Sequence, residues 1–125
     1  MPPATDGRTH TVERTVFESD VREFADLSND RQDRHLDPGA DGRLMIHGLL
    51  TATLPAKVGG DPGVLASRMA FSFRRPVYTG QQVHCAVTFT GVTEGRDRDE
   101  ARADIECAVD GETVLSGSFE GVVLR

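Results

Sequence analysis

Hydrophobic and polar residues alternate along most of the second half of the chain, which predicts β-strands with one buried face. The pattern is clear around residues 69–74, 83–89 and 103–109, and a last strand follows near the C-terminus. Asp110-Gly111 predicts a tight hairpin, and the polar run 93–99 predicts a longer hairpin loop. The residues predicted to face the core are Met69, Phe71, Phe73, Val83, Cys85, Val87, Phe89, Ala103, Ile105, Cys107, Val109, Leu115, Phe119 and Val123.

The first half of the chain shows helical spacing instead. Residues 1–8 are polar and contain proline, so we expect a frayed end before a weakly patterned strand at 9–17. Ser19 is the predicted N-cap of a short helix, whose buried face would carry Val21, Phe24, Ala25 and Ser28. Residues 31–43 are rich in Asp, Arg and Gly, which predicts an irregular loop.

Residues 46–58 are almost uncharged and predict a helix with no solvated face, ended by Gly59-Gly60 and kinked or shortened at Pro55. Such a helix has to be covered by other parts of the fold. The order of elements therefore predicts an α+β protein, in which an antiparallel sheet wraps around a central apolar helix, with residues 9–125 forming a single domain.

Composition narrows the possible functions. The chain has 125 residues, a net charge of -6 and no Lys/Arg cluster free of neighbouring acids, so we expect no nucleic-acid partner. No apolar stretch approaches the roughly 20 residues that span a bilayer, and the start does not resemble a signal peptide, so we expect a cytoplasmic protein without membrane contact. Lys57 is the one lysine among 14 basic residues, which fits either a halophile or a GC-rich genome.

Cysteine and histidine usage predicts neither a disulfide framework nor a metal site. Cys85 and Cys107 both fall on the apolar phase of a strand, which favours reduced thiols in the core. None of the four histidines has a cysteine or a second histidine at the close spacing of a zinc motif.

The residues with the clearest chemical potential are Asp30 and His35 in the loop and the His47-Gly48 pair before the apolar helix. A carboxylate and an imidazole can act as base and acid, and an N–H at a helix N-terminus can stabilise an oxyanion. An aspartate and a histidine in so charged a loop also fit a solvated cluster, and the nearby Arg31 and Arg34 could pair with Asp30 and lower its pKa.

The segment 28–37, followed by Ile46-His47-Gly48, resembles the signature of MaoC-like hotdog hydratases, the (R)-specific enoyl-CoA hydratase family. Residues 71–80 resemble a second, structural motif of that family. The arginine-rich, aspartate-rich composition would suit a haloarchaeal member. The positions that match the catalytic signature are Ser28, Asp30, His35, Asp37, His47 and Gly48, whereas Asn29, Gln32, Asp33 and Arg34 replace the family's glycine, asparagine, proline and aliphatic residue.

The resemblance implies a hotdog fold and the hydration or dehydration of a 2-enoyl or 3-hydroxyacyl thioester, linked to CoA or a carrier, without metal or other cofactor. Asp30 would be the base that activates water and His35 would position that water and share the proton transfers. The Gly48 N–H would form the oxyanion site, and Ser28 and His47 would add weaker substrate contacts. It also implies a homodimer or higher homo-oligomer.

Two other functions stay open. The substituted loop fits a non-catalytic subunit that binds acyl-CoA or has a structural role. A thioesterase ranks lower, because such enzymes usually place a carboxylate on or beside the central helix and residues 48–58 contain none. For His47, a structural position in the core or at the helix cap is the alternative to substrate contact.

Overall fold

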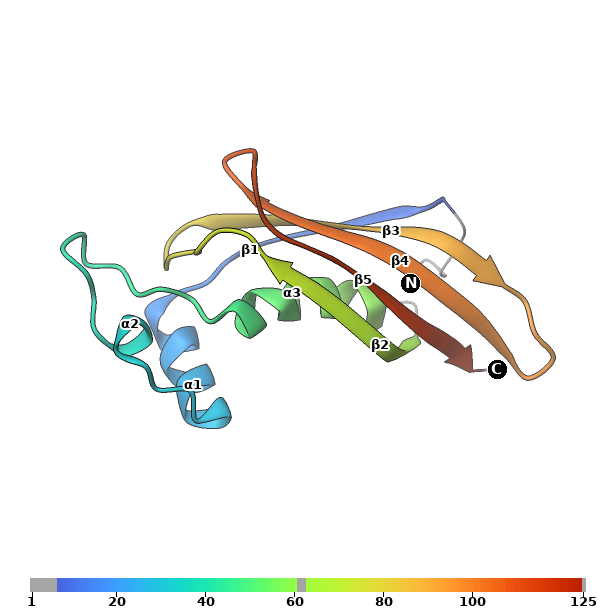
Figure 1. Cartoon of the computed structure of the whole chain (residues 1–125), viewed down its shortest axis with the longest axis horizontal. Coiled ribbons are helices and arrows are strands. Elements are labelled where there is room, and N and C mark those ends of the chain that lie inside the picture. Colours follow the sequence, from blue (N-terminus) through green and yellow to red (C-terminus); the bar gives the residue numbers. More distant parts are fainter. Residues whose placement is uncertain (1–6, 61–62, 125) are drawn as a thin grey trace.

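The computed structural model describes residues 7–60 and 63–124 and shows an antiparallel sheet with a long helix against one face (Figure 1). The sheet order is β1-β3-β4-β5-β2, so β1 and β2 form its two edges. This is the predicted α+β arrangement of a sheet around an apolar helix. In chain order, the elements are β1 Thr9–Thr15, α1 Glu18–Ser28, α2 Asp33–Leu36, α3 Gly48–Gly60, β2 Val64–Phe73, β3 Gln82–Thr93, β4 Arg98–Val109 and β5 Glu112–Leu124.

The core lies between α3 and the middle of the sheet. The predicted inward faces of β3 and β4 are buried, as expected from their alternation. On the helix side, Ala52, Leu54 and Pro55 are buried against them. Pro55 does not shorten α3, which continues to Gly60, so that part of the prediction was wrong. Its buried ring packs with the core, and this packing offsets the missing backbone donor.

The hairpins follow the turn residues. Asp110 and Gly111 have φ angles of 50° and 79°, the left-handed values that a two-residue type I′ turn needs. The predicted loop between β3 and β4 forms but is shorter than 93–99, because β3 continues to Thr93 and β4 begins at Arg98. At the other end, residues 1–6 of the expected frayed segment lie outside the described residues. Gly7 is already tied to β3, because its N–H donates to Phe89 O at 2.7 Å.

The helices before α3 differ in detail from the predictions. α1 begins at Glu18, before Ser19, because the Asp20 carboxylate accepts the Phe17 N–H at 2.9 Å and stabilises this start. The predicted buried face is confirmed at Val21 and Ala25, whereas Phe24 is half-buried and Ser28, in the last turn, is exposed. α2 forms within the segment predicted to be irregular, since a helix of four residues is too short to produce a periodic pattern.

The prediction of reduced core thiols was wrong, because Cys85 and Cys107 form a disulfide. The two residues are directly opposite each other in β3 and β4, with Cα atoms 4.0 Å apart. Both side chains are buried, as their inward phase indicated. What the alternation alone did not show was the register that brings the two sulfur atoms together.

One apolar face remains uncovered, contrary to two predictions. The core-facing side of β2 was expected to be buried, but Met69 is 42% and Phe73 is 54% exposed because no strand lies beyond this edge. α3 was expected to have no solvated face, but Leu49 is 62% exposed, and Thr53 and Ala56 are exposed as well. We call Leu49, Met69 and Phe73 the open apolar surface.

Within the described ranges, no helix combines the length and apolar character needed to cross a lipid bilayer.

Candidate functional site

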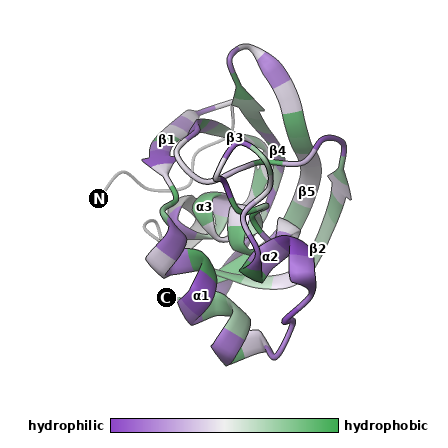
Figure 2. Cartoon of the chain, turned by 90° about the vertical axis from the view of Figure 1, so that its left-hand side faces the viewer, coloured by the Kyte–Doolittle hydropathy of each residue, from purple (hydrophilic) through white to green (hydrophobic). Residues whose placement is uncertain are grey.

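A cavity of about 430 Å³ lies where α1, α2 and the start of α3 meet the end of the sheet. In Figure 2, α1 and α2 lie together at this end of the molecule, close to α3. The walls are mainly apolar, and the polar groups gather around the first turn of α3. The residues that line it include Phe24, Ser28, Asp30, Gln32, Arg34, His35, Met45, His47, Gly48, Leu49, Phe73, Arg74 and Arg75.

Asp30 reaches the cavity through a tight turn after α1. The helix ends at Asn29, whose φ of 60° reverses the chain, and the Ser28 hydroxyl accepts the Asp30 N–H at 3.1 Å. The Gln32 amide donates to Asp30 Oδ1 at 2.9 Å. This bond, with smaller contributions from His35 and His47, holds the pKa of Asp30 below its usual value.

The predicted competition from Arg31 for Asp30 does not occur, because Arg31 pairs with Asp26. Among the ion pairs of the described residues, Asp30 takes part in one only, with His35. The Asp30 side chain is 41% exposed, so its carboxylate remains open to the cavity.

His35 comes from α2 and is 5% exposed. Its Nδ1 lies 2.7 Å from Met45 O, and because a carbonyl only accepts, Nδ1 carries the hydrogen. In the neutral ring, Nε2 then presents a lone pair, at 3.8 Å from Asp30 Oδ2. This separation is too long for a direct hydrogen bond, and an intervening water could contact both atoms.

His47 precedes α3 and is 3% exposed. Its Nε2 lies 2.8 Å from the backbone oxygen of Asp30 and donates to it, while Nδ1 is buried with no hydrogen-bond partner among the described residues. The His47 ring stacks on His35 with centroids 3.7 Å apart and an angle of 16° between the planes, and Phe24 lies edge-on to it at 4.9 Å.

Gly48 is the first residue of α3, where backbone N–H groups have no carbonyl partner within the helix. A Cβ at this position would lie 2.7 Å from two atoms of the Phe73 ring, so a larger residue would have to displace that ring. Gly48 lines the same cavity as Asp30 and His35.

Asp30, His35 and His47 each offer a potential metal ligand, and the three atoms lie within 4.8 Å of one another. The sequence placed the three residues in one site but did not predict them as a metal site, because the two histidines lack the close spacing of a zinc motif. Imidazole binds a metal in the plane of its ring, and two nearly parallel rings 3.7 Å apart cannot both direct a lone pair at one ion. This orientation favours proton chemistry over metal binding.

The chain is similar along most of its length to proteins named as hydratases or dehydratases. It is 32% identical to a 3-hydroxybutyryl-CoA dehydratase of Methylorubrum extorquens, over 89% of this chain and 75% of that protein. It is 28% identical to an (R)-specific enoyl-CoA hydratase of Rhodospirillum rubrum, over 90% and 83% of the two chains. The solved structure of an (R)-hydratase from A. caviae involved in PHA biosynthesis superposes with a TM-score of 0.83, at 26% identity over 97% of both chains.

The chain belongs to the MaoC-like (R)-specific enoyl-CoA hydratase family. No protein-family model matches it. The similarity to the solved hydratase structure confirms the hotdog fold that the sequence predicted.

The structure brings together five of the six residues that match the family signature, Ser28, Asp30, His35, His47 and Gly48, around this cavity. The sixth, Asp37, is the C-cap of α2 and is not among the residues that line it. Sequence reasoning treated Gln32 only as a departure from the family and did not identify its contact with Asp30. The sequence feature that could have indicated this contact is the position of the Gln32 amide two residues after Asp30, in the same turn.

Proposed function

We propose that this protein hydrates 2-enoyl thioesters and dehydrates 3-hydroxyacyl thioesters, linked to CoA or to a carrier protein. The observation that carries the proposal is the Asp30–His35 pair, with 3.8 Å between Oδ2 and Nε2, in a cavity that also contains the Gly48 N–H. A relative named for this reaction at 32% identity supports the same conclusion.

In the proposed mechanism, a water molecule lies between Asp30 Oδ2 and His35 Nε2. Asp30 removes one proton as the water oxygen bonds to C3 of the enoyl group, and the same proton passes through His35 Nε2 to C2, which returns Asp30 to its carboxylate form, so that one water is added in total. His35 Nε2 can carry this proton, because Nδ1 remains bonded to Met45 O throughout. Negative charge develops on the thioester oxygen, where the Gly48 N–H donates.

We also propose that the protein is a homodimer whose partner covers the open apolar surface and extends the sheet from the β2 edge. Pairing at this edge would satisfy the free backbone groups of β2 and bury the exposed faces of β2 and α3 together. A cytoplasmic location belongs to the same proposal, because CoA thioesters are metabolites of that compartment. We further propose a halophilic host, because the chain contains a single lysine, Lys57.

The decisive experiment follows the loss of the enoyl-thioester absorbance of crotonyl-CoA, at low and at multimolar salt, with the wild type and Asp30→Asn. We expect turnover by the wild type and a loss of roughly 10²–10⁴-fold in the variant. Binding of crotonyl-CoA without turnover would support the non-catalytic subunit instead. Release of free CoA thiol would identify a thioesterase.

A further inference from the structure

His47 contacts both members of the proposed catalytic pair, Asp30 through a hydrogen bond and His35 through ring stacking. Its Nε2–H donates to the backbone oxygen of Asp30 at 2.8 Å. Its ring lies flat against the His35 ring, with centroids 3.7 Å apart. A single buried side chain therefore connects the end of the α1 turn to α2.

The hydrogen bonds of the two rings define their tautomers. Because both backbone carbonyls can only accept, His35 is protonated on Nδ1 and His47 on Nε2. In the neutral form of each ring, the other nitrogen presents the lone pair. For His47 that atom is Nδ1, which is buried and has no partner among the described residues.

The stack restricts the orientation of His35. An imidazole held by one hydrogen bond can still rotate about that bond, which would move Nε2 away from Asp30. The His47 ring covers one face of His35, and Phe24 supports His47 edge-on at 4.9 Å. This arrangement leaves His35 little freedom to tilt.

We infer that His47 is a positioning residue, which fixes the His35 ring by stacking and the Asp30 backbone by a hydrogen bond, and that it does not bind the substrate itself. The inference rests on the proposed hydratase function for its kinetic consequences. It replaces the substrate contact that the sequence suggested for His47. A displacement of about 1 Å between reacting groups can lower a rate by roughly 10²-fold, so the loss of either contact should reduce kcat.

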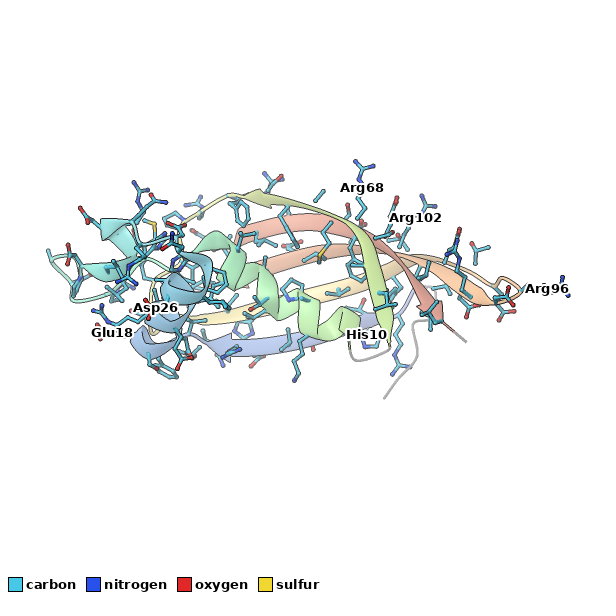
Figure 3. The ribbon with its side chains drawn as sticks, turned by 90° about the horizontal axis from the view of Figure 1, so that it is seen from below. His10, Glu18, Asp26, Arg68, Arg96 and Arg102 are labelled. Carbon is cyan, nitrogen blue, oxygen red and sulfur yellow. A yellow bond between two sulfur atoms is a disulfide. The ribbon has the colours of Figure 1, made fainter. Side chains whose placement is uncertain are left out.

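Two substitutions separate the two contacts. His47→Gln keeps an N–H donor for Asp30 but removes the ring, whereas His47→Phe keeps a ring for the stack but donates nothing. His10→Gln is the matched control, because His10 also has an unpartnered buried nitrogen and an aromatic neighbour, Phe89. His10 lies near the opposite end of α3 from α1 (Figure 3) and outside the cavity lining.

We expect kcat for crotonyl-CoA hydration to fall roughly ten- to a hundredfold in each His47 variant, with KM changed by less than about threefold. His10→Gln should leave both constants unchanged. A rise in KM with kcat preserved would overturn the inference and assign His47 to substrate binding. Unchanged kcat in a folded His47 variant would overturn it as well, and either variant that folds is sufficient for this test.

A measurement independent of activity uses the ¹⁵N resonances of the His35 ring. The Met45 O hydrogen bond keeps Nδ1 protonated in both proteins, so the inference expects sharp His35 ring signals in the wild type and signals broadened by exchange between ring orientations in His47→Gln. Signals as sharp in this variant as in the wild type would show that His47 does not hold the ring. If the wild type fails to hydrate crotonyl-CoA, the proposed function fails, while the resonances still decide whether His47 positions His35.

Discussion

The open apolar surface predicts a specific effect of charge on assembly. Complete burial of a Leu, Met or Phe side chain stabilises by about 1.5–3 kcal/mol. Leu49, Met69 and Phe73 are 62%, 42% and 54% exposed, so burying these exposed fractions in both protomers of a symmetric dimer contributes about 5–9 kcal/mol. This amount is comparable to the ~8 kcal/mol of a micromolar complex, and strand pairing at β2 would add to it.

Met69→Glu is the test of this estimate. The substitution removes about 0.6–1.3 kcal/mol of burial from each protomer, and the two carboxylates of a symmetric dimer must also be desolvated. We therefore expect the dimer dissociation constant to rise at least about a hundredfold, which corresponds to about 2.7 kcal/mol. Sedimentation equilibrium measures this constant directly over a range of protein concentrations.

Leu27→Glu is the control, because Leu27 is 85% exposed on α1 and is not part of the open apolar surface. It should leave the dissociation constant unchanged. A wild type that remains monomeric at micromolar concentration would refute the reasoning. Dimers of Met69→Glu as stable as those of the wild type would show that the interface lies elsewhere.

Two further changes test the site itself. Gln32→Leu removes the amide that stabilises the ionised Asp30, so the pKa of Asp30 should rise and the acid limb of the pH profile of kcat/KM should move to higher pH. If the acid limb does not move, the group that titrates in it is not Asp30. Gly48→Ala places a methyl group 2.7 Å from the half-exposed Phe73 ring, which can give way, so the free energy of unfolding should fall by no more than about 1–3 kcal/mol in chemical denaturation. In steady-state kinetics kcat should fall at least about tenfold, and full activity would exclude Gly48 from the oxyanion site.

The sequence predicted those strands best whose neighbours lie within the same chain. β3 and β4 are bordered on both sides by other strands and face α3, so alternation translated directly into burial. β2 shows the same alternation, but its apolar residues lie at an edge. Periodicity identifies which side chains share a face, and it does not identify what covers that face.

The absence of charge in α3 was informative in the same limited way. It showed correctly that the helix needs cover, and the sheet supplies this on the side of Ala52 and Leu54. The side of Leu49 remains open in the single chain. Because Leu49 also lines the cavity, a partner on the open apolar surface would complete the substrate site as well as the core.

The disulfide depended on information that alternation lacks. Both cysteines were assigned to the correct face, but their pairing requires the register of β3 against β4. That register depends on the length of the 93–99 hairpin and on a bulge between Phe89 and Gly91. A shift by one residue would have separated the two sulfur atoms.

The loop substitutions are the main argument for a non-catalytic subunit, and their local geometry weakens it. Asn29 replaces a glycine and adopts the left-handed φ of 60°, which asparagine tolerates better than most residues. Asp33 replaces a proline at the first position of α2, where an acidic side chain is also favourable. Gln32 replaces an asparagine and bonds the Asp30 carboxylate. Three of the four departures therefore preserve the backbone path and the hydrogen bonding around Asp30. The fourth, Arg34, adds a positive charge to the cavity wall, so its effect should be on which acyl groups bind more than on how water is activated.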